Sequence, residues 1–191
     1  MMPNKIKTKV VIDASLERSA GMVEKFLMQS NWEWEHWRDC ELIDKWTEHN
    51  LTTDEGVTSA LGVQFAGVTQ ITDWFVLIYN TDTTPALTMT YATPAFTEST
   101  HYSEATRPAW QSGAVVSKNI TNSANKASFT MSTAETIYGA ALIGGGSAAD
   151  TKNDKAGGGF LYCVSDFSGG SKTVASSDIL KVTISITGQD L

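Results

Sequence analysis

The sequence is poor in cysteine, histidine and positive charge. Its two cysteines, Cys40 and Cys163, lie far apart in 191 residues without a metal-ligand spacing, which argues against a disulfide framework and against a zinc site. Fourteen lysine and arginine residues face 21 acids, and the formal net charge is −7. A dedicated nucleic-acid binder needs a clustered cationic surface to neutralise phosphates, so this class is disfavoured.

Long apolar runs are also missing. No run of 18 apolar residues occurs, and the N-terminal residues lack the succession of charged, apolar and small side chains that marks a secretory signal. We therefore expect a protein that is made in the cytoplasm and has no membrane partner. A length of 191 residues suits one domain with a substantial core.

Residues 1–30 differ from the rest because they hold five lysines or arginines against three acids. The stretch 5–12, KIKTKVVI, is typical of a short basic strand or extended arm. From 14 to 29, apolar residues recur at four-three-four spacing and predict one face of an amphipathic helix: Leu16, Ala20, Val23 and Leu27. That face needs a partner, either the body of the same chain (31–191) or a neighbouring subunit.

The stretch Asn31 to Cys40, NWEWEHWRDC, holds three of the six tryptophans. Trp32 and Trp34 share one parity with His36 and Arg38, which predicts a half-buried strand over 31–38. We expect a turn near Asp39 and a return strand from Ile43 to Leu51 that sets Trp46 against the first strand's aromatics. The alternative is a sugar-binding platform, with Glu33 and Glu35 as hydrogen-bonding groups.

A short helix is expected next, near 53–61. Thr52 lies three residues before Glu55 and predicts a capping box. Val57, Ala60 and Leu61 follow as its apolar face, and Gly62 or Gly67 ends the helix.

From residue 70 onward the sequence has β character. The apolar run 71–80, ITDWFVLIYN, predicts a central strand covered on both sides. Further strands are expected at 113–120, 127–132, 136–144, 159–166 and 179–187, with Leu180, Val182, Ile184 and Ile186 facing the core. The glycine-flanked stretch 144–159 leads into another β run instead of a helix, so it predicts a long mobile hairpin tip, not a phosphate loop.

These elements predict an all-β fold. We expect an antiparallel β-sandwich of jelly-roll type, with one short helix and an N-terminal arm plus helix (1–30) on a β-sandwich body (31–191).

Catalytic motifs are weak. His49 beside Glu48, or His101 beside Glu98 and Glu104, would make an acid/base pair only if folding brought them together. Carboxylate pairs for glycoside hydrolysis can be drawn from any acidic β protein, and nothing activates a particular serine or threonine. We expect no enzyme activity, no metal and no cofactor.

Several segments, in order, resemble a family of small virion proteins of tailed bacteriophages. The most specific is YSEATRPAW (102–110), similar to the family's Y-x-EATRPAW. RDCELIDKWTEHNLTTDEGV (38–57), TDWFVLIYN (72–80) and the closing DILKVTISIT (178–187) resemble its W-x-HNLVTNEGL, WYIGL and GDTLKVTYT segments. The resemblance covers about residues 31–187 and implies a structural virion protein without catalytic residues.

From this we expect a capsid decoration or cement protein on the capsid surface that binds the major capsid protein or another virion protein, as a small homo-oligomer. The alternatives are a tail, neck or collar component, a carbohydrate-binding module and a glycan hydrolase. The predicted partner interface combines the basic arm with the motif at 107–110: Lys5, Lys7, Lys9, Val10, Val11, Arg107 and Trp110.

Overall fold

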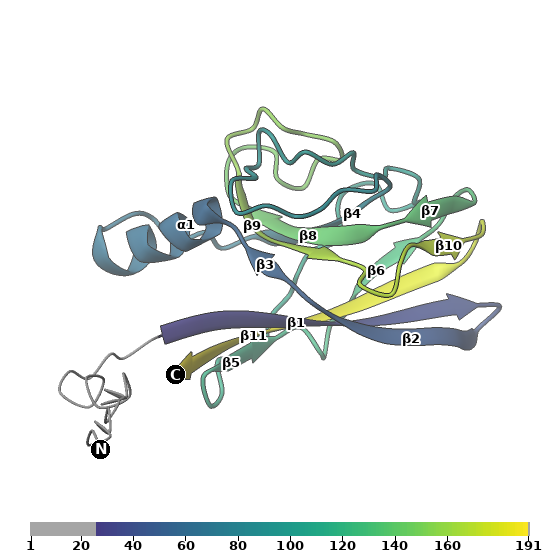
Figure 1. The fold of residues 1–191 in the computed structure, drawn as a ribbon, viewed down its shortest axis with the longest axis horizontal. Coiled ribbons are helices and arrows are strands. Elements are labelled where there is room, and N and C mark those ends of the chain that lie inside the picture. The colour runs from purple at the N-terminus through teal and green to yellow at the C-terminus, as the bar shows by residue number, and fades with distance from the viewer. Residues whose placement is uncertain (1–25, 191) are drawn as a thin grey trace, which may run out of the picture.

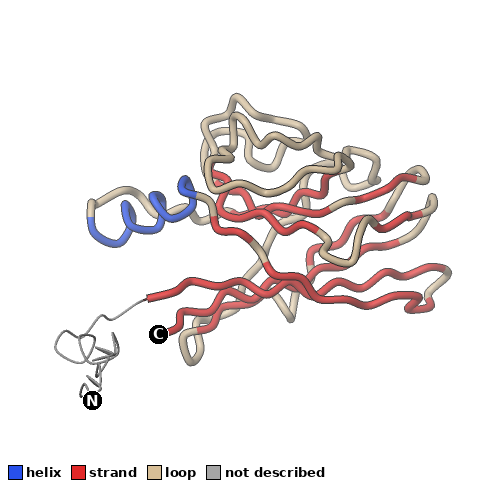
Figure 2. The backbone as a smooth tube through the Cα atoms, viewed as in Figure 1, coloured by secondary structure: helices blue, strands red, loops and turns tan. Residues whose placement is uncertain are grey.

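The computed structural model describes residues 26–190, which form two large antiparallel β-sheets packed face to face and one small two-stranded sheet, with one helix projecting from one end (Figures 1 and 2). The elements, in chain order, are β1 (Phe26–Arg38), β2 (Glu41–His49), β3 (Leu51–Thr52), α1 (Asp54–Phe65), β4 (Trp74–Tyr79), β5 (Asn119–Thr121), β6 (Ala127–Thr130), β7 (Glu135–Ile137), β8 (Gly139–Gly144), β9 (Phe160–Asp166), β10 (Lys172–Val174) and β11 (Ile179–Asp190). This confirms the prediction of an all-β sandwich with one short helix.

The two large sheets differ in how they are covered. The open sheet has the strand order β2-β1-β11-β5, and β6 also pairs with β11. The covered sheet has the order β3-β9-β8-β4, and long loops lie over its outer face (Figure 1). A third, two-stranded sheet joins β7 to β10. Because the sheets join strands distant in sequence, most close contacts in the fold are long-range.

Tryptophans fill the space between the sheets. Trp32 and Trp34 on β1 are fully buried, whereas Glu33 on the opposite parity is exposed, as the alternation predicts. The predicted hairpin is also confirmed, since Trp34 pairs directly with Trp46 on β2, with ring centroids 5.8 Å apart. Phe167 packs edge-on against Trp34 at 5.3 Å. Such aromatic pairs contribute about 0.5–1.5 kcal/mol beyond their area.

The apolar run at 71–80 gives β4, whose residues Val76 to Tyr79 are all buried. Val76 and Ile78 face the open sheet, whereas Leu77 and Tyr79 face the loops, as predicted for a strand covered on both sides. However, β4 lies at the end of the covered sheet and is not central. Its outer edge is closed by bridges from Phe75 to Ala109 and from Tyr79 to Glu98.

Several strand boundaries differ from the predictions. Residues 26–29, expected as helix, belong to β1, where they pair with the end of β11 because backbone pairing outweighs the short helical pattern. Of the strand expected at 113–120, only β5 forms, since Ser117 and Lys118 have positive φ angles. The stretch 136–144 is split into β7 and β8, and β10 was not predicted. Residues 14–25 lie outside the described residues.

Helix α1 begins one residue later than the predicted capping box. Thr53, not Thr52, is the N-cap, and its hydroxyl accepts from the Gly56 amide at 3.0 Å. Glu55 does not complete a box. Its carboxylate instead accepts the backbone amides of Tyr91 and Leu161, which attaches the helix to a loop and to β9. The helix ends at Phe65, and Gly67 follows with φ +68°, so the predicted glycine stop is confirmed.

Candidate functional site

The motif at 102–110 contains a buried arginine. Arg107 is 2% exposed, and its guanidinium forms a two-pronged ion pair with Glu98, with Nε to Oε1 at 2.9 Å and Nη2 to Oε2 at 2.5 Å. It also donates to the carbonyls of Ala149 at 2.9 Å and Asp154 at 3.1 Å, and to the Tyr91 hydroxyl at 3.2 Å. Burial disfavours the charge, but the bonds and charge of Glu98 outweigh it and raise the pKa of Arg107.

This network fastens the loops to the covered sheet. The Arg107 amide donates to the Asp150 carbonyl at 2.8 Å, and the Asn153 amide donates to Glu98 at 2.8 Å. Tyr91 donates to the Asp154 carboxylate at 2.7 Å, and burial raises the pKa of Tyr91 to about 12. The stretch 144–159 connects the antiparallel strands β8 and β9, as predicted for a hairpin, and the carbonyls of Ala149 and Asp154 attach it to the Arg107 guanidinium.

The predicted partner interface is corrected at two positions. Arg107 is buried, donates to the Ala149 carbonyl and forms its ion pair with Glu98. Trp110 is 8% exposed and donates from its indole nitrogen to the Ile184 carbonyl at 3.3 Å. Both side chains are buried in the protein interior, so neither is available on the surface to contact a partner. The other five predicted interface residues lie outside the described residues: Lys5, Lys7, Lys9, Val10 and Val11.

One histidine belongs to a buried ionic cluster. The Asp178 carboxylate lies 2.7 Å from His36 Nε2 and accepts two bonds from Arg38, each at 2.7 Å, and the Ala175 amide at 2.7 Å. The hydrogen-bonded Arg38 holds the pKa of Asp178 well below its usual range. Oδ2 accepts the bonds from His36, Arg38 Nη2 and the Ala175 amide, and Oδ1 accepts the bond from Arg38 Nε. The cluster ties the end of β1 to the start of β11.

His101 pairs with Glu135 at 3.1 Å, not with Glu98 or Glu104 as considered from the sequence. Ser99 and Asn80 also donate to the Glu135 carboxylate. A catalytic triad needs the histidine between serine and carboxylate, so that its nitrogen accepts the serine proton. Here serine and histidine both bond to the carboxylate, so the histidine does not lie between them and does not accept the serine proton.

His49 lies 3.5 Å from Gln29 and forms no acid/base pair with Glu48, whose carboxylate accepts the Ser168 amide. Within residues 26–190 no group of three histidine, cysteine or acidic side chains is placed to hold a metal ion. No described helix is long and apolar enough to cross a membrane.

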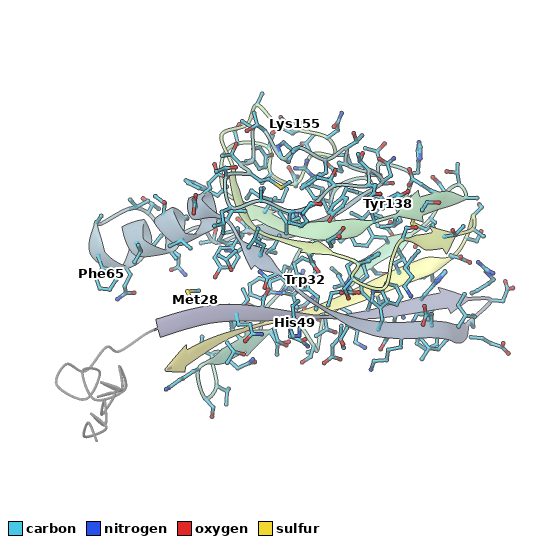
Figure 3. The ribbon with its side chains drawn as sticks, viewed as in Figure 1. Met28, Trp32, His49, Phe65, Tyr138 and Lys155 are labelled. Atoms are coloured by element: carbon cyan, nitrogen blue, oxygen red, sulfur yellow. The ribbon has the colours of Figure 1, made fainter. Side chains whose placement is uncertain are left out.

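An apolar groove lies between α1 and the start of β1. It has a volume of about 770 Å³ and is lined mainly by Met28, Leu51, Val57, Ala60, Leu61 and Tyr162. Figure 3 shows Met28 on the side of β1 that faces α1, and Phe65 at the free end of the helix. The predicted apolar face of α1 is therefore largely exposed, with Val57 at 47% and Leu61 at 54%. The buried face carries Gly56 and Ser59 instead.

The second exposed feature is the outer edge of β2. No strand in the described part of the chain pairs with this edge, which runs for nine residues. The opposite end of the sandwich is different, because loop bridges close the edge of β4. Leu42 and Ile43 on β2 are about half exposed. An open strand edge presents unpaired backbone groups that can accept a strand from another chain.

A scan against protein-family models and a search of curated proteins both give no match for this chain. The candidate sites therefore rest on geometry. Sequence reasoning missed Glu98 and Asp154 as partners of Arg107, and it missed the exposure of α1. The one available signal was the spacing of glycines around 144–159, which marks backbone packed closely against something else.

Proposed function

We propose that the protein is a structural component of a tailed-phage virion, and specifically a capsid decoration protein that binds and stabilises the lattice of the major capsid protein. The segmental resemblance over residues 31–187 supports this proposal. The buried framework made by the motif at 102–110 is consistent with it, because Arg107 and Trp110 are used for rigidity.

The single observation that carries the proposal is the nine-residue outer edge of β2, with which no strand of the described residues pairs. A protein that binds a repeated lattice needs extended surfaces, and pairing with an open strand edge supplies regular backbone hydrogen bonds. The basic arm, residues 5–12, pairs with the edge strand of a neighbouring subunit. Many copies on one particle make modest individual contacts sufficient.

Charge favours the pairing of the arm with a β2 edge. The arm carries three lysines, whereas β2 carries three acids and one lysine. Opposite charges on neighbouring strands stabilise pairing by about 0.2–1 kcal/mol each. The arm of one copy on the β2 edge of the next forms a head-to-tail contact, which closes into a ring if the rotation allows.

Mass spectrometry of gently disassembled virions tests the location. We expect hundreds of copies per particle, in a constant ratio to the major shell protein. A count of about a dozen or fewer would instead support the alternative of a tail, neck or collar component, since such parts have low rotational symmetry. The alternative of a carbohydrate-binding module has less support, because the rings of Trp32, Trp34 and Trp110 are buried and only Trp37 of the candidate tryptophans is partly exposed.

Deletion of residues 1–12 tests the arm. The chain should keep the far-ultraviolet circular dichroism of the full protein but no longer sediment with capsids that lack the protein. The cut must end well before Phe26, because β1 begins there and pairs with β11. Undiminished sedimentation of the shortened chain would remove the arm from the mechanism.

A further inference from the structure

Helix α1 packs with its small residues inward and its large apolar residues outward. Val57, Leu61 and Phe65 recur every four residues and share one face. A surface helix normally buries such a stripe. Here the opposite face is buried because a Cβ at Gly56 would lie 2.3 Å from the Tyr162 carbonyl oxygen, so only glycine allows this approach to β9. The apolar stripe is left uncovered by the described residues.

The groove beside this stripe suits an apolar occupant. Its volume of about 770 Å³ would hold roughly 25 water molecules at about 30 Å³ each. Among the described residues, none that lines the groove is charged. A phosphate, a metal ion or a nucleic acid would find no charged partner there, whereas apolar side chains would release that water from an apolar wall.

A segment of suitable chemistry is attached directly to the groove. Met28 lines the groove, and the amphipathic pattern of Leu16, Ala20 and Val23 ends five residues before it. Five residues span at most about 17 Å, so the apolar face is held close to the groove. A tethered segment has an effective concentration in the millimolar range, which favours it over the same segment of another molecule.

We propose that residues 14–24 form a helix that docks in the groove of its own chain, with Leu16, Ala20 and Val23 against Val57 and Leu61. This docking does not depend on the virion role. It covers the apolar stripe of α1 and holds the start of β1. It also gives the arm, residues 5–12, a defined direction of exit from the body.

Thiol crosslinking in the full chain tests the docking. In a Cys40→Ser background, Ala20→Cys is combined with Leu61→Cys and treated with a short bismaleimide. Leu61 is more than half exposed, so the substitution leaves the core intact, and circular dichroism checks this. The control joins Ala20→Cys to the native Cys40, which is exposed in the turn between β1 and β2, at the far end of the hairpin. We expect crosslinking at Leu61→Cys to be about tenfold faster than at Cys40.

The outcomes are distinct. Crosslinks within one chain, shown by mass spectrometry of a mixture of isotopically labelled and unlabelled protein, support docking in cis. Mixed-mass dimers would overturn it in favour of a second copy as the source of the segment. Equal rates at both positions would overturn docking altogether. Adding Leu16→Asp should make crosslinking of Ala20→Cys to Leu61→Cys no faster than crosslinking to Cys40. An unchanged ratio of these two rates would exclude an apolar contact.

Discussion

The buried Arg107 and Glu98 pair should account for a large share of the stability of the loops. In an Arg107→Met variant, Glu98, which is 6% exposed, keeps only the Asn153 amide as a partner, and two carbonyls lose their donors. Removing one partner of a buried pair costs about 3–5 kcal/mol. This is a large part of a total stability of about 5–15 kcal/mol. If the free energy of unfolding falls by about 2 kcal/mol for each molar of urea, the urea concentration at the unfolding midpoint should fall by about 2 M.

Urea titration followed by tryptophan fluorescence measures this loss. The matched control is Lys45→Met, since Lys45 and Glu33 lie 3.9 Å apart and both are about half exposed. Its effect should stay within about 0.5 kcal/mol. Glu98→Gln combined with Arg107→Met should cost at least about 1 kcal/mol less than the sum of the single variants. Additive losses, or a loss below about 1 kcal/mol for Arg107→Met, would refute the reasoning.

Three further predictions concern single sites. Arg38 depresses the folded-state pKa of Asp178, so the Asp178 carboxylate stabilises the fold fully above about pH 4 and loses this effect as pH falls further. The difference in free energy of unfolding between the wild-type protein and Asp178→Asn, measured by urea titration, should therefore shrink in acid. A difference that stays constant with pH would contradict this. In thermal unfolding, Gly56→Ala should lower the free energy of unfolding by about 1–3 kcal/mol, because the added Cβ meets the backbone of β9. The control Gly169→Ala has open space around it and should change this free energy little. Equal effects of the two substitutions would be inconsistent with tight packing of α1. Burial raises the pKa of Cys163 to about 12, so a thiol reagent at pH 8 should modify Cys40 rapidly and Cys163 only on unfolding; two equally fast thiols would disprove this.

Strand parity could be predicted from the sequence because it is a local property. Alternation placed Trp32 and Trp34 inside and Glu33 outside, and the same rule placed Leu180, Val182 and Ile184 in the core. The period of two needs no knowledge of the partner sheet. Ile186 is only partly buried, which shows that the open sheet is less completely covered toward the end of β11.

The orientation of α1 could not be predicted in this way. Its pattern suggested that Val57 and Leu61 face the body, yet Gly56 and Ser59 do. Which face packs depends on how closely β9 approaches, and that distance is a tertiary quantity. The cap shift from Thr52 to Thr53 has a similar origin, since the Thr53 hydroxyl also donates to a carbonyl of β9.

The role of Arg107 was beyond sequence reasoning for a different reason. Its partners Tyr91, Glu98, Ala149 and Asp154 come from two separate loops, up to 47 positions away. The motif around Arg107 marked the position as specific but did not distinguish an interior role from a surface role. A buried guanidinium is uncommon, because it must satisfy all its donors internally.

The pairing of Phe26 with Asp190 brings the beginning of β1 and the end of β11 to the same side of the molecule. A tag or cargo fused after β11 would therefore sit beside the start of β1 and crowd whatever contacts it. The turn at Asp39 and Cys40, at the opposite end of the same hairpin, points away from that region and takes positive φ angles that a longer inserted loop would relieve. Insertion at this turn is thus the better route for displaying a peptide on this protein.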